Sequence, residues 1–186
     1  MRRGFLFIMV CVFPFVGSLM AQKTQHNDFP NMPIDENTKL VTYREVVQQQ
    51  GNSSVLYDRA VKWANGYFSN PMVAIKKTDQ NNTTLVCESN IKISTLAKDG
   101  KTWTAAGFVY YTLTIEAKEN RYRYTITDIY KKESARFPIE KWLDNSRPEW
   151  TSARYDHLHQ IDEAVHKIIE ALKEGMQPEK VIIDEW

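Results

Sequence analysis

Two alternating stretches on either side of Glu119-Asn120 constrain the fold more than any other feature of the chain. A two-residue turn there joins strands at residues 107–118 and 121–130, because strand side chains alternate between two faces. The pairing separates apolar from polar residues, as in an antiparallel sheet covered by helices on one side. The predicted pairs are Ala117 with Tyr122, Ile115 with Tyr124 and Leu113 with Ile126 on the apolar face, and Glu116 with Arg123, Thr114 with Thr125 and Thr112 with Thr127 on the polar face.

Three further strands are predicted outside this hairpin. Apolar and β-branched residues gather there between turn-forming residues such as Gly51-Asn52 and Asp99-Gly100. In the first of these strands, we expect Val41, Tyr43 and Val46 to be the packing residues. The three predicted strands cover residues 40–48, 72–77 and 83–96.

Two amphipathic helices complete the predicted elements. Ser53 or Ser54 is the expected cap of the first helix, because a serine side chain accepts a hydrogen bond from the free amides of the first turn. Trp63 lies on the apolar stripe of that helix, so we expect it to be buried. The second helix covers residues 156–174 and stops at Gly175, and an irregular connection at residues 137–155 precedes it.

The predicted fold class is therefore α+β. Two helices that each have one apolar face can cover the apolar side of a single sheet. We expect a two-layer sandwich, an antiparallel five-stranded sheet with two helices on one face, in the order β-α-β-β-β-β-α.

The N-terminus predicts where the protein acts. Arg2 and Arg3 precede an apolar run at residues 5–16, and small residues follow, which is typical of a secretory signal peptide. The run is too short to span a bilayer, so we expect no transmembrane segment after cleavage. We expect the protein to be exported to the periplasm or the outer envelope rather than released from the cell. The predicted organisation is a signal peptide at 1–21, a flexible leader at 22–32, a domain at 33–175 and a tail at 176–186.

Charge and cysteine content limit the function classes. Without Arg2 and Arg3, the 24 basic residues fall to 22 against 23 acidic ones. A protein that binds phosphates needs a basic surface, so we expect no nucleic-acid partner. Cys87 is the one cysteine outside the predicted signal peptide, which leaves no internal disulfide.

Several segments resemble a domain family of unknown function that is common in exported Bacteroidetes proteins. The resemblance lies in the segments 33–36, 41–47 and 56–60, and in the hairpin with Tyr122-Arg123-Tyr124 and Thr127-Asp128. The family is described as having a fold like that of the TATA-binding protein, and the resemblance implies that fold here. It implies no catalytic residue, because the family has no settled activity, and a fold name does not imply DNA binding.

The residues suited to chemistry each have a simpler explanation. His159, Glu163 and His166 lie on one side of the second predicted helix and carry metal-binding atoms, but such residues also form ordinary solvated helix faces. Cys87 is either a nucleophile or a buried inert thiol between apolar neighbours. We expect the simpler explanation for both. The prediction is therefore no catalytic residue, no cofactor and no metal site.

The polar sheet face and the connection before the last helix are the candidate interaction surface. Its predicted residues are Tyr110, Glu116 and Arg123 on the sheet, with Trp142 and Trp150 on the connection. The alternatives are a solvated sheet face and tryptophans that pin the connection to the core. This surface predicts that the protein binds an unknown protein, peptide or glycan of the cell envelope. A small periplasmic hydrolase and a structural accessory domain of an envelope assembly remain alternatives.

Overall fold

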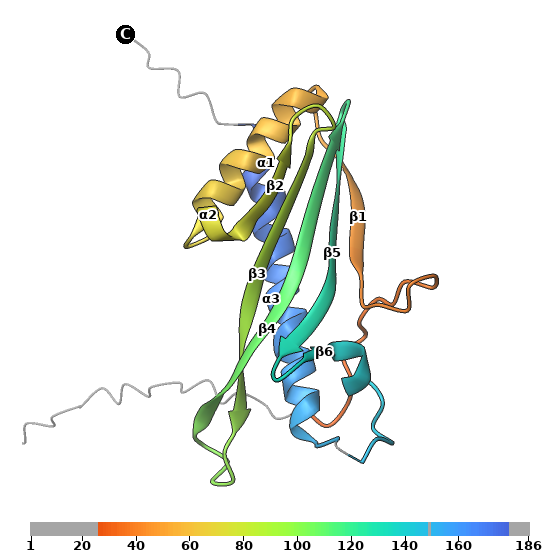
Figure 1. Ribbon diagram of the computed structural model, residues 1–186, viewed down its shortest axis with the longest axis vertical. Helices are drawn as coiled ribbons and strands as arrows, with labels where there is room; N and C mark the ends of the chain where they lie inside the picture. Colours follow the sequence, from red (N-terminus) through yellow and green to blue (C-terminus); the bar gives the residue numbers. More distant parts are fainter. Residues whose placement is uncertain (1–25, 149, 179–186) are drawn as a thin grey trace, which may run out of the picture.

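The computed structural model describes residues 26–148 and 150–178 (Figure 1). One antiparallel sheet has the strand order β1-β5-β4-β3-β2, and a sixth strand, β6, pairs with β5. The strands are β1 (Tyr43–Gln48), β2 (Ile75–Asp79), β3 (Thr84–Leu96), β4 (Trp103–Lys118), β5 (Arg121–Lys132) and β6 (Arg136–Pro138). The helices are α1 (Ser53–Tyr67), α2 (Pro71–Ala74), the 3-10 helix η1 (Ile139–Trp142) and α3 (Ala153–Gly175).

The predicted α+β class is confirmed, with more elements than expected. β6 pairs three residues with β5, which is too short a stretch for side-chain alternation to show in the sequence. The expected strand at 72–77 begins instead as α2, because Pro71 stands at the first helical position, where its fixed φ favours a helical turn. The sheet therefore has six strands rather than five in the described part of the chain.

The predicted register of the β4–β5 hairpin is confirmed at every pair. One extra residue enters β5 beyond these pairs, since Thr112 faces Thr127 while Tyr110 faces Tyr130. Asp128 supplies this bulge with a φ of 55°, a left-handed conformation in which aspartate is tolerated. The bulge keeps Tyr110 and Tyr130 on the same face of the sheet as the threonine pairs.

Both long helices lie on one side of the sheet, with α3 passing behind the strands in Figure 1. The cap of α1 is Asn52, one residue before the predicted serines, and its side chain accepts from the backbone N–H of Val55 at 2.9 Å. Trp63 is buried as predicted, with 8% of its surface exposed. Gly175 lies against it inside α3, where a Cβ would overlap the indole ring. Glycine is thus needed there for the close approach of α1 and α3.

Strand β1 corrects one predicted packing residue. Tyr43 faces the helices, and Val46 faces the opposite way with 52% of its surface exposed, because three residues separate them. Val41 is fully buried as expected, but it lies before β1 in an isolated bridge with Ile34.

The segment before the sheet is not the flexible leader that its polar composition predicts. Phe29 packs against Tyr155 and Trp150, with ring centroids 4.8 and 6.2 Å apart, and Met32 is 7% exposed. The described domain therefore includes residues 26–32. At the other end, Met176 is fully buried directly after α3. The predicted signal peptide and most of the predicted tail lie outside the described residues.

Within the described residues, no helix combines the length and apolar character needed to cross a membrane.

Candidate binding surface

The outer face of the sheet is the side that α1 and α3 leave uncovered, and it is turned toward the viewer in Figure 1. Alternation along β4 and β5 places three of the predicted surface residues on this face, namely Tyr110, Glu116 and Arg123. Paired threonines fill the space between them, as the sequence predicts. The candidate surface is thus positioned by the same alternation that builds the core on the other side.

One end of the outer face carries an excess of positive charge. Arg123 donates to the same Glu116 oxygen from Nε at 2.8 Å and from a terminal nitrogen at 2.7 Å. The exposed Val46 lies directly opposite Arg123 on β1. We call this region the basic patch, and its residues are Val46, Lys118, Arg121 and Arg123. They line a shallow groove of about 190 Å³ together with Glu116 and Tyr122, so that three cations face one carboxylate.

Aromatic side chains occupy the other end of the outer face. Tyr110 and Tyr130 stack with ring centroids 5.6 Å apart, and the Arg136 guanidinium lies 3.9 Å from the centre of the Tyr130 ring. Phe108, two residues before Tyr110, is 49% exposed. Large exposed aromatics and arginine are the residue types that most often anchor protein interfaces.

The two tryptophans of the connection hold it in place. Trp142 is 2% exposed and lies beneath the Arg154 guanidinium, so it cannot belong to the interaction surface as we predicted. Trp150 is half-buried, and its indole N–H donates to the Trp142 carbonyl at 2.9 Å. It also packs against Tyr155, with centroids 4.8 Å apart. The alternative that these residues pin the connection to the core fits the geometry better.

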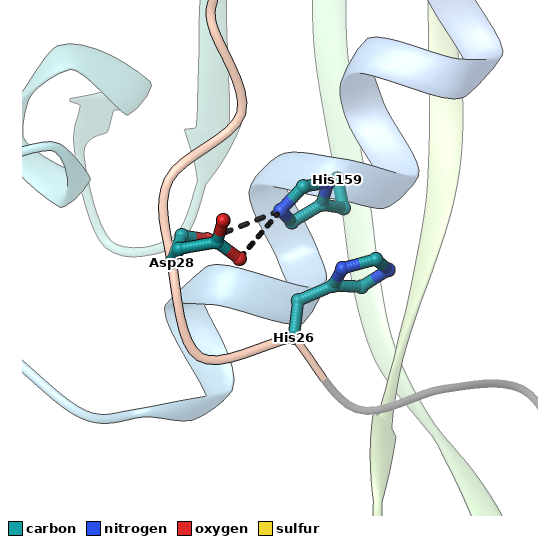
Figure 2. A group of neighbouring side chains, drawn as sticks. All are labelled: His26, Asp28 and His159. Carbon is teal, nitrogen blue, oxygen red and sulfur yellow. Dashed lines mark hydrogen bonds and ion pairs between the residues drawn. The ribbon is translucent and has the colours of Figure 1, made fainter.

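The residues His159, Glu163 and His166, considered above as an alternative metal-binding set, do not come together on α3. His166 turns to Asp162, whose backbone carbonyl lies 2.9 Å from its Nδ1. His159 turns instead to the N-terminal segment, where it meets His26 and Asp28 (Figure 2). The sequence does not predict this group, because Asp28 and His159 are 131 residues apart in the chain.

Cys87 is fully buried in the core, as its apolar neighbours predict. Burial raises the pKa of its thiol to about 12, because the apolar surroundings disfavour the charged thiolate. A catalytic cysteine requires the opposite shift. This thiol therefore stays protonated at neutral pH and acts as a small core side chain.

These features define a class of protein, an α+β domain whose antiparallel sheet is covered by helices on one face and open on the other. Residues 43–132 match the family model of a domain of unknown function, DUF4468, with a TBP-like fold. The resemblance inferred from the sequence is confirmed.

Two solved structures share this fold. One is a DUF4468 family protein from Bacteroides ovatus, with a TM-score of 0.60 and 14% identity over 81% of this chain and 92% of the other. The second is a TBP-like protein from Parabacteroides distasonis, with a TM-score of 0.52 and 14% identity over 76% of this chain and 97% of the other. At such low identity, these two comparisons show that the structures share a fold. The comparison with curated proteins gave no match.

Proposed function

We propose that this chain is an exported envelope protein that binds a protein partner through the outer face of its sheet and catalyses no reaction. One observation carries the proposal. The outer face exposes Val46 and Phe108 among arginines and lysines, whereas the helices cover the opposite face. Apolar side chains exposed beside cations fit an interface better than they fit a surface that only meets water.

The shape of this face favours a macromolecular partner. Sites for small ligands are concave and enclose about 300–1,000 Å³. The groove at the basic patch has about 190 Å³, and the rest of the outer face is an open sheet surface. A flat surface gains binding energy by burying a wide area, which a protein partner supplies.

Charge then indicates the chemistry of the partner. The chain as a whole is nearly neutral, with 24 basic and 23 acidic residues, so three cations around one carboxylate form a local excess. Such a patch attracts a complementary negative surface and steers its approach. The partner that fits is a protein segment with acidic residues and an apolar side chain to cover Val46.

A capture experiment with matched variants tests the binding proposal. The purified protein serves as bait for envelope extracts of its host, and two variants are compared with it. Arg123→Ala removes a cation from the outer face. Lys167→Ala is the control, because it removes a cation from α3 on the opposite side of the sheet. We expect Arg123→Ala to weaken capture about tenfold, the effect of about 1.4 kcal/mol at a central arginine. Lys167→Ala is expected to capture as much partner as the wild-type protein does, because Lys167 is an exposed residue of α3.

The same experiment identifies other classes of partner. Capture should fall as the salt concentration rises, because exposed charges are screened. Nuclease or glycosidase treatment should leave it unchanged. Equal capture by Arg123→Ala and the original protein, or capture that disappears with nuclease, would argue against an acidic protein partner on this face.

Export has its own test. Arg2, Arg3 and the apolar run that follows support it, because this pattern is typical of a secretory signal peptide. We expect the intact mass of protein purified from its native host to lack about the first 21 residues. A mature protein that retains residues 5–16 would overturn the proposed location.

A further inference from the structure

Two histidines and an aspartate from distant parts of the chain meet beside the first half of α3 (Figure 2). His26 and Asp28 belong to the N-terminal segment, and His159 belongs to α3. One potential ligand atom of each side chain lies within 4.8 Å of the other two. His159 Nε2 is 3.8 Å from a carboxylate oxygen of Asp28 and 3.1 Å from its backbone carbonyl oxygen.

We propose that His26, Asp28 and His159 bind a divalent transition-metal ion, which fastens the N-terminal segment to α3. Two imidazole nitrogens and one carboxylate form a donor set that suits Zn²⁺, Ni²⁺ or Cu²⁺ and is too nitrogen-rich for Ca²⁺ or Mg²⁺. The Asp28 carbonyl or a water molecule supplies a fourth ligand. The proposal is independent of the outer face and of any partner bound there.

Contacts that need no metal already hold the three residues near one another. The backbone N–H of His26 donates to the Asp156 carboxylate at 2.8 Å, and Asp156 is 3% exposed. The His26 and His159 rings stack with centroids 3.7 Å apart and an interplanar angle of 18°. The backbone contact to Asp156 therefore holds the N-terminal segment beside α3 before the ion arrives. The two stacked rings must turn out of their parallel arrangement to bind one ion, because each imidazole lone pair lies in the plane of its ring.

Binding also requires the ligand atoms to move closer together. Zn²⁺ bonds to nitrogen and oxygen are about 2.0–2.2 Å long, which places neighbouring ligand atoms of a tetrahedron roughly 3.3 Å apart. The present spread of up to 4.8 Å must therefore contract. The Asp28 side chain is 83% exposed, so it can rotate toward the imidazoles without disturbing the core.

The test uses protein without a histidine tag, titrated with Zn²⁺ by calorimetry and melted with and without the ion. We expect one ion per chain and a melting temperature about 5 °C higher at a hundredfold excess over Kd. Asp28→Asn and His159→Gln should each weaken binding by at least about tenfold. The matched control is His166→Gln, because His166 lies on the same helix and contacts Asp162 rather than the cluster.

Two further readouts separate a specific site from adventitious binding. Co²⁺ should give the visible absorption of a tetrahedral nitrogen–oxygen site in the original protein and in His166→Gln, but not in His159→Gln. Zn²⁺ should also slow hydrogen exchange in residues 26–32. No saturable binding, or equal affinity in His159→Gln and the original protein, would overturn the proposal.

Discussion

Replacement of Trp63 by alanine is expected to lower the free energy of unfolding by about 3–5 kcal/mol. The side chain is 8% exposed, stacks on Tyr67 at 4.9 Å and meets Phe68 edge-on at 5.8 Å. It also fills the space that the absent side chain of Gly175 leaves between α1 and α3. Alanine would leave a cavity where the two helices touch.

Urea denaturation of Trp63→Ala measures this loss. Val55→Ala is the control on the same helix, because Val55 is 40% exposed and its truncation should change stability by no more than about 0.5 kcal/mol. A loss below about 1 kcal/mol for Trp63→Ala would mean that the indole contributes little to the packing of α1 on α3.

The second large effect is a loss of stability in mild acid through His157. This residue is 5% exposed, and its Nε2 lies 2.7 Å from the Thr95 hydroxyl oxygen. Burial, and after it the nearby cations Arg154 and Lys131, lower the pKa of His157 to about 4. The unfolded chain, with a histidine pKa near 6.5, therefore takes up a proton at a higher pH than the folded chain does.

The sign follows from that order of protonation. The contribution of His157 is fully present above about pH 6.5 and is lost as the pH falls toward 4. The shift corresponds to about 3 kcal/mol in total, of which roughly 2 kcal/mol is lost by pH 5.

Unfolding free energies at pH 7.5 and pH 5 check this prediction. His157→Gln should lose much less stability between these two values than the original protein. His166→Gln should lose as much as the original, because His166 is 60% exposed on the same helix. The same pH dependence in His157→Gln and the original protein would show that another group is responsible.

The sequence predicts those parts of the fold in which apolar residues recur at the regular spacing of a strand or a helix. Two facing strands share one alternation in the β4–β5 hairpin, so a shift of one residue would bury Arg123 and expose Tyr122, and only one register is acceptable. The stripe through Trp63 likewise fixes the face of α1. Long-range packing has no such period. The docking of Phe29 and the burial of Trp142 depend on contacts with residues far along the chain.

The candidate surface was predictable to the same extent. Alternation placed Tyr110, Glu116 and Arg123 on the outer face, but it did not show that Val46 lies beside them, because the partner of β1 is the distant strand β5. The group of His26, Asp28 and His159 was not predictable at all. It depends on how the N-terminal segment with His26 and Asp28 packs against α3. That segment has no regular pattern of apolar residues from which its packing could be predicted.

Side-chain footprinting of the protein alone and with its captured partner tests the central claim most directly. Hydroxyl radicals report on aromatic and methionine side chains, and strand amides that are already hydrogen-bonded do not obscure the result. We predict that oxidation of Phe108 and Tyr110 falls on binding, whereas oxidation of Met72, which is 94% exposed on α2, stays the same. Protection of Met72 with unchanged oxidation of Phe108 and Tyr110 would place the partner off the outer face and contradict the account.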